Sequence, residues 1–81
     1  MNCFFPEGVC SKQILFDIKD GIVLNVNFVG GCEGNLQGVS RLVEGMSVSR
    51  VIKTLEGITC GKRGTSCPDQ LATALQRVGE L

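Results

Sequence analysis

The first half of the chain has an alternation of apolar and polar residues that predicts a β-hairpin. Between Lys12 and Lys19 the apolar residues recur at the two-residue period of a half-buried strand, namely at Ile14, Phe16 and Ile18. Asp20-Gly21 follows, and this dipeptide favours a tight hairpin turn because both central positions of the turn take positive φ. The run from Ile22 to Val29 then returns, and its alternation predicts one face made of Leu24, Val26 and Phe28. Residues 3–9 either add a short edge strand or pack over the core.

After Gly30-Gly31 the spacing of the apolar residues changes to that of helices. Asn35 is the predicted N-cap of a first helix that closes at Gly45. Ser47 is the predicted N-cap of a second helix that ends at Gly57, and Pro68 suits the first turn of a third helix that ends at Gly79. The order predicts a single α+β domain over residues 1–81, with an antiparallel hairpin or three-stranded sheet and about three helices on one face.

Composition and charge narrow the range of functions. The chain has 81 residues, and eight basic residues balance eight acidic ones, which argues against a nucleic-acid partner or an anionic membrane surface. A net charge of zero gives little protection against self-association, so a homodimer is one expected state. The N-terminal segment does not resemble a signal peptide, and no apolar run reaches the length of a membrane span, so we expect a cytoplasmic protein.

The cysteines are the candidate functional residues of the chain. There are five of them and no histidine, which removes the commonest general base, and no catalytic residue is identified. Four cysteines lie at the ends of predicted elements rather than within apolar stripes, where a structural cysteine would be expected. We therefore predict a metal site made of Cys10, Cys32, Cys60 and Cys67. The alternative is that these thiols are buried or incidental, as we expect for Cys3.

Two other features have simpler interpretations. Lys62-Arg63 is interpreted as part of a solvated loop rather than a binding patch. Asp69 is expected to stabilise the N-terminus of the third helix, although a carboxylate at this position also suits a metal ligand.

Several motifs together resemble those of the short TSCPD-domain proteins. Residues 65–69 spell TSCPD, and the chain also contains Cys10-Ser11, the segment GGCEGN at residues 30–35, and Cys60-Gly61. The likeness runs from about Pro6 to the C-terminus. Related domains form the C-terminal extension of some ribonucleotide reductases, so the resemblance implies a protein partner, with such a reductase as the candidate. An 81-residue chain has no room for the reductase barrel, and we do not expect it to be an enzyme on its own.

The order of elements and cysteines is also similar, more distantly, to that of iron–sulfur cluster assembly scaffold proteins. By position, Cys10, Cys32 and Cys67 match the three cysteines that hold a nascent cluster or zinc in that family. Two accessory ligands of the family are replaced by Lys12 and Ser66. Cys60 would then supply a fourth ligand and give a closed all-thiolate site, which is typical of structural zinc or a stable iron–sulfur centre.

The leading hypothesis is therefore a small cysteine-rich module that binds zinc, with an iron–sulfur cluster as the alternative cofactor. It would serve as an accessory or interaction domain linked to ribonucleotide reductase and deoxyribonucleotide metabolism. A scaffold that assembles or transfers iron–sulfur clusters or sulfur is the second hypothesis. The third is a thiol–disulfide relay to a partner enzyme through Cys60 and Cys67, whose spacing differs from the CxxC of efficient relays.

Overall fold

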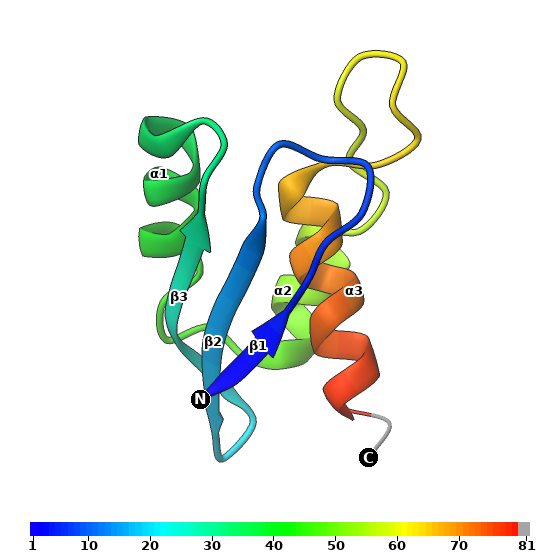
Figure 1. Ribbon diagram of the computed structural model, residues 1–81. Coiled ribbons are helices and arrows are strands. Elements are labelled where there is room, and N and C mark those ends of the chain that lie inside the picture. Colours follow the sequence, from blue (N-terminus) through cyan, green and yellow to red (C-terminus); the bar gives the residue numbers. More distant parts are fainter. Residues whose placement is uncertain (80–81) are drawn as a thin grey trace.

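A three-stranded antiparallel sheet forms where the alternating pattern predicts the hairpin (Figure 1). The structure, a computed structural model that describes residues 1–79, has strands β1 (Asn2–Phe4), β2 (Gln13–Lys19) and β3 (Ile22–Val29) in the spatial order β1-β2-β3. Asp20 and Gly21 both have positive φ, 53° and 75°, as the predicted hairpin turn requires. The edge strand expected within residues 3–9 begins one residue earlier and is only three residues long. The last two residues of the predicted 1–81 domain lie outside the described residues.

A β-bulge at Asn25 changes which side chains of β3 face the core. Leu15 pairs with Asn27 and Asp17 pairs with Leu24, so Phe16 faces two residues of β3 instead of one. The extra residue is Asn25, whose φ is 55°. Because one inserted residue inverts the alternation, Val23 and Val26 are both buried and Leu24 turns to the other face. The prediction that Leu24 shares a face with Val26 and Phe28 is therefore wrong.

Polar contacts hold Asn25 in its left-handed conformation. The Asn25 side-chain amide donates to Asp17 Oδ2 at 3.0 Å, and its backbone N–H donates to Glu44 Oε1 at 2.8 Å. The first of these hydrogen bonds is the main reason that the pKa of Asp17 lies below its ordinary value. Asparagine tolerates positive φ better than other residues with a Cβ, which explains its place at the bulge.

Three helices follow the hairpin: α1 (Glu33–Val43), α2 (Val48–Leu55) and α3 (Cys67–Gly79). The predicted N-cap of the second helix is confirmed, because Ser47 Oγ accepts a hydrogen bond from the Arg50 N–H at 3.2 Å. The predicted N-cap of the first helix is wrong. The helix begins two residues before Asn35, with Cys32 as N-cap, because the left-handed Gly30 and Gly31 complete the turn out of β3 within two residues.

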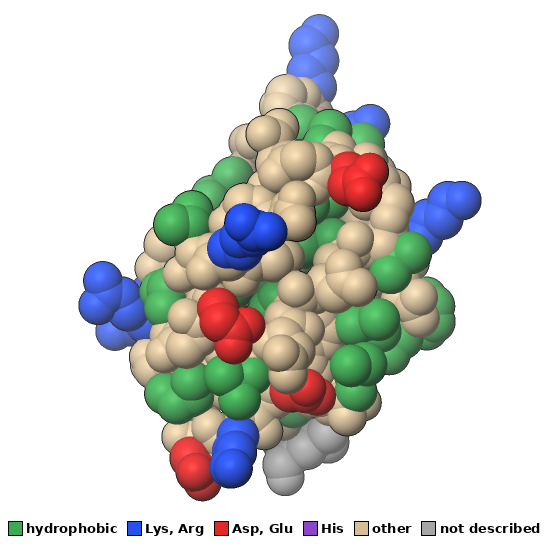
Figure 2. All heavy atoms as spheres, turned by 90° about the vertical axis from the view of Figure 1, so that its left-hand side faces the viewer, with side chains coloured by type: hydrophobic (Ala, Val, Ile, Leu, Met, Phe, Trp, Pro, Cys, Tyr) green, Lys and Arg blue, Asp and Glu red, His purple; other side chains and the backbone are tan. Residues whose placement is uncertain are grey.

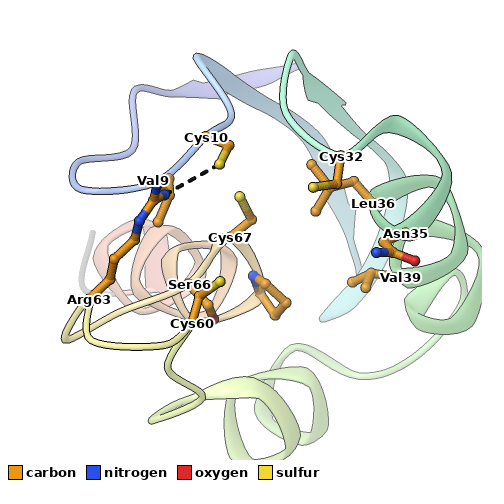
Figure 3. Close-up of a pocket in the computed structure, with 11 residues that line it drawn as sticks. Val9, Cys10, Cys32, Asn35, Leu36, Val39, Cys60, Arg63, Ser66 and Cys67 are labelled. Carbon is orange, nitrogen blue, oxygen red and sulfur yellow. Dashed lines mark hydrogen bonds between the residues drawn. The ribbon is translucent and has the colours of Figure 1, made fainter.

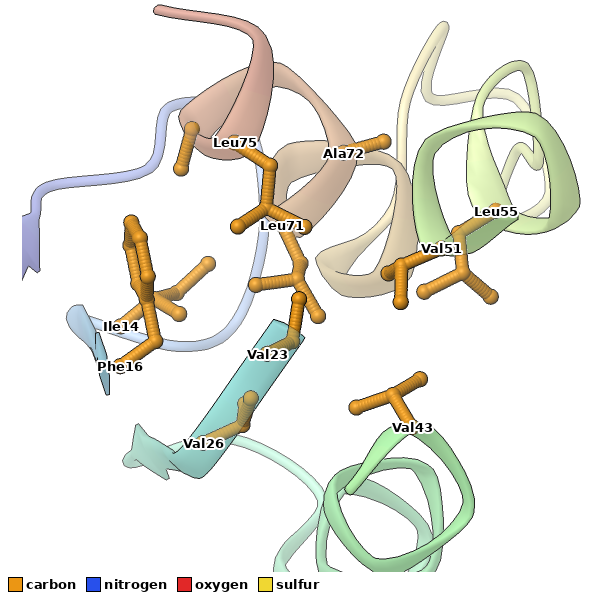
Figure 4. Close-up of a cluster of buried hydrophobic side chains, with 11 residues drawn as sticks. Ile14, Phe16, Val23, Val26, Val43, Val51, Leu55, Leu71, Ala72 and Leu75 are labelled. Atoms are coloured by element: carbon orange, nitrogen blue, oxygen red, sulfur yellow. The ribbon is translucent and has the colours of Figure 1, made fainter. Parts of the chain in front are cut away.

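The helices cover one face of the sheet, and the core lies between the two layers (Figure 4). The largest fully buried side chains come from both layers and pack in one cluster: Ile14, Phe16, Val23, Val51, Leu71 and Leu75. The α+β prediction of a sheet with three helices is thus confirmed. In the part of the chain that the structure describes, no helix is long and apolar enough to cross a membrane.

The surface formed by α1 carries acidic and basic side chains in a mixed distribution (Figure 2). Neither sign gathers into a patch among the described residues on this face, which agrees with the balanced composition. Leu42 is an exposed apolar side chain of α1.

The bulge predicts an order of stability between two variants at position 25. Asn25→Ala and Asn25→Gly both lose the hydrogen bond to Asp17, but only alanine is strained at positive φ. We expect the free energy of unfolding of Asn25→Ala to be lower than that of Asn25→Gly by about 1 kcal/mol. Urea denaturation of the two reduced proteins measures the difference. An alanine variant as stable as the glycine variant would contradict the bulge.

Candidate metal centre

One end of the molecule gathers the segments that carry the four predicted ligands. Figure 1 shows that α1 and α3 both begin at this end, beside the loop between β1 and β2 and the loop between α2 and α3. Cys32 is the N-cap of α1 and Cys67 is the first residue of α3. The positive end of each helix dipole therefore lies close to one of these thiols.

Cys10, Cys32, Cys60 and Cys67 line one pocket of about 200 Å³ (Figure 3). Cys32 projects into it from the α1 side, and the other three cysteines lie across from it. The five cysteines of the chain, all within the described residues, have free thiols. Cys3 lies outside the pocket on β1, where its sulfur accepts a hydrogen bond from Gln13 Nε2 at 2.9 Å. The structure thus separates Cys3 from the other four cysteines.

The donor set of the pocket suits a soft metal, because all four candidate ligands are thiols. Within residues 1–79, no three cysteine, aspartate or glutamate side chains are arranged as the ligands of a single ion. Metal binding by these cysteines therefore stays a prediction, and what the structure contributes is their common pocket.

Gly31 allows the turn after β3 to lie directly against the Cys10 loop. Its φ is +82°, and a Cβ at this position would lie 3.1 Å from the Ser11 nitrogen and 3.3 Å from Cys10 Cβ. Both the conformation and the space therefore require glycine. Any larger residue would push the turn that carries Cys32 away from Cys10.

Ser11 connects the loop between β1 and β2 to the first residue of α3. This serine is buried, and its Oγ donates a hydrogen bond to Cys67 Sγ at 3.2 Å. Hydrogen bonds to ligand atoms orient them and tune their donor strength, so Ser11 supports Cys67 whether or not a metal is bound.

The polar residues of the TSCPD segment form a network around the start of α3. The Asp69 carboxylate accepts two hydrogen bonds, one from the Gly57 N–H at 2.7 Å and one from Thr65 Oγ1 at 2.6 Å. Ser66 Oγ accepts from the Asp69 N–H at 3.2 Å and donates to the Ile58 carbonyl at 2.7 Å. Thr65, Ser66 and Asp69 thus tie the α2–α3 loop to α3 and leave Cys67 facing the pocket. Asp69 lies in the first turn of α3, but its carboxylate accepts from groups that precede the helix, and the side chain that accepts from a helix N–H is that of Ser66.

A hydrogen-bonded turn places Arg63 beside the thiols. The Arg63 N–H donates to the Cys60 carbonyl at 3.1 Å, and the Cys60 N–H donates to the Thr65 carbonyl at 3.1 Å. From this turn the Arg63 guanidinium reaches Cys10, with Nη1 3.3 Å from Sγ. The hydrogen bond to Cys10 is the main reason that the pKa of Arg63 is raised, and the charges of Cys10, Cys60 and Cys67 add to it.

The interpretation of Lys62-Arg63 as a solvated loop missed this contact, since Arg63 lines the pocket although it is exposed. The available signal was the spacing, because a β-turn brings the residue three positions after Cys60 back to it. Ser11 and Gly31 were also not identified as site residues from the sequence.

The network around Asp69 predicts a loss of stability in Asp69→Ala. Two hydrogen bonds to a charged carboxylate disappear, and we expect the free energy of unfolding to fall by about 2 kcal/mol. Cys60 should then react faster with a thiol reagent relative to Cys3, because the loop that carries it is no longer held. Urea denaturation and mass-spectrometric alkylation rates measure the two effects. Glu7→Ala, which removes an exposed carboxylate, is the control; equal effects in both variants would contradict the assigned role.

Comparison with known proteins identifies the family. The sequence model of the TSCPD domain matches residues 2–78, which is nearly the whole chain. No curated protein and no solved structure matches the chain. The resemblance drawn from residues 65–69 and the cysteine-containing segments is thereby confirmed. The chain belongs to the TSCPD domain family.

Proposed function

We propose that this protein is a small zinc-binding module whose ligands are Cys10, Cys32, Cys60 and Cys67. The observation that carries the proposal is the single pocket that these four cysteines line, although they come from four separate segments of the chain. Cysteines without a common role have no reason to converge in this way, and free thiols more often fill apolar core positions.

The chemistry of the pocket supports zinc in particular. The chain has no histidine, so the ligand set is all thiolate, and a set of four thiolates is typical of closed structural zinc sites. Zinc would join the loops that carry Cys10 and Cys60 to the starts of α1 and α3. Binding would bring the four sulfurs to about 2.3 Å from one ion. Such a site has no open position for substrate, and it would act by fixing this end of the fold.

An iron–sulfur cluster is the alternative cofactor. The pocket volume of about 200 Å³ is the observation that favours it, because a single ion needs less space. Four cysteine ligands also suit a cluster of four irons. In that case, anaerobic reconstitution with iron and sulfide would give a brown protein, whereas the zinc proposal requires a colourless one.

We further propose that the module is an accessory or interaction domain rather than an enzyme in its own right. Membership of the TSCPD family supports this, together with the likeness of such domains to the C-terminal extension of some ribonucleotide reductases. A reductase of that kind is the proposed partner, and the role would belong to deoxyribonucleotide metabolism. A closed metal site would suit an interaction domain, because it would stabilise the surface that docks on the partner.

The zinc proposal predicts which cysteines are needed. Protein purified and titrated without oxygen should bind about one zinc per chain, and cobalt substituted for zinc should show intense sulfur-to-cobalt charge-transfer absorbance. Replacing any one of the four pocket cysteines by serine should weaken zinc binding by more than about tenfold, since a neutral hydroxyl is a poor ligand for zinc.

Cys3→Ser is the matched control, because it removes a thiol that lies outside the pocket. It should leave the zinc affinity unchanged. The proposal fails if the wild-type protein takes up neither zinc nor iron while all five thiols remain titratable. It also fails if Cys3→Ser weakens binding as much as the pocket variants do.

A further inference from the structure

A permanent positive charge lies at the edge of the thiol pocket. Arg63 Nη1 lies 3.3 Å from Cys10 Sγ, and Arg63 lines the pocket together with Cys60 and Cys67. Figure 3 shows that it reaches Cys10 from the side of the pocket opposite Cys32. The guanidinium therefore leaves the space between these two thiols open and acts as an outer partner of the Cys10 sulfur.

The charge of the proposed centre explains why an outer cation matters. Four thiolates and one Zn²⁺ carry two negative charges in total. Among the described residues that line the pocket, Arg63 is the one charged side chain apart from the thiols, and several of the others are apolar (Val9, Leu36, Val39 and Pro68). Arg63 and three of the four thiols are exposed, so water screens distant charges, and a cation in direct contact with a ligand sulfur offsets the excess negative charge most effectively.

The backbone of the Cys60 turn fixes the place of this cation. The Arg63 N–H donates to the Cys60 carbonyl at 3.1 Å, while its side chain donates to Cys10. Arg63 thus joins the loop that carries one candidate ligand to the sulfur of another. It contributes a hydrogen bond and a charge at the same time, which a neutral side chain would not provide.

We propose that Arg63 is a positioning residue that supplies the counter-charge of a doubly negative four-thiolate centre and so raises the metal affinity of the pocket. This proposal rests on the proposed zinc function, and it attributes part of the zinc affinity of the pocket to the charge of Arg63. Removal of partners that hydrogen-bond to metal ligands typically costs tenfold to a hundredfold in metal affinity.

Three variants test the proposal: Arg63→Gln, Arg63→Lys and Lys62→Gln. Zinc dissociation constants are measured anaerobically by competition with a chromophoric chelator, and the thermal stability of each metal-free variant is recorded as well. We expect Arg63→Gln to raise the dissociation constant by roughly tenfold and Arg63→Lys to restore most of the loss, because lysine keeps the charge. Lys62→Gln removes the neighbouring charge and should change the constant by less than about twofold.

The outcomes separate this proposal from the zinc function itself. If the wild-type thiols bind zinc and Arg63→Gln binds it equally well, the counter-charge role is overturned while the zinc function stands. If Arg63→Lys is as weak as Arg63→Gln and both metal-free proteins are destabilised, Arg63 only holds the loop, and the proposal is again overturned. If the wild-type protein binds no zinc, both proposals fall together.

Discussion

The two hydrogen bonds of the Asp69 carboxylate are the constraint on which the thiol pocket depends. They tie the Gly57 N–H and the Thr65 hydroxyl to the first turn of α3, so the exposed loop between them closes on the helix. Cys60 lies within this loop and Cys67 begins the helix. One carboxylate thus determines where two of the four thiols lie. Loops with few buried apolar contacts are otherwise among the least stable parts of a fold.

The other two thiols depend on a close backbone approach on the opposite side of the pocket. Gly31 lets the turn before α1 lie against Ser11, and Ser11 in turn donates to Cys67. The family motif can therefore be divided by role. Its threonine, serine and aspartate are structural residues that fix the α2–α3 loop, and its cysteine faces the pocket.

Local patterns predicted much of this structure and missed what depends on contacts between distant residues. The alternation of residues 12–29 predicted both hairpin strands, and Ser47 and the glycines marked helix ends, because each signal acts over a few residues. The bulge at Asn25 was not predicted, because a single inserted residue does not change the composition of a strand and only inverts the alternation of buried and exposed residues after it. Four cysteines were predicted at element ends; the structure places Cys32 and Cys67 at helix starts and the other two in loops, and all four line one pocket. Arg63 had no such signal beyond its spacing from Cys60, and the likeness to iron–sulfur scaffold proteins stays a prediction.

We propose that four thiols of this pocket bind one metal ion. X-ray absorption at the zinc edge of the zinc-loaded protein tests it most directly, because the first shell reports both the kind of ligand and the distance. We expect four sulfur atoms at about 2.3 Å and no nitrogen or oxygen ligand. A first shell dominated by oxygen or nitrogen, or one with two sulfurs or fewer, would contradict the account.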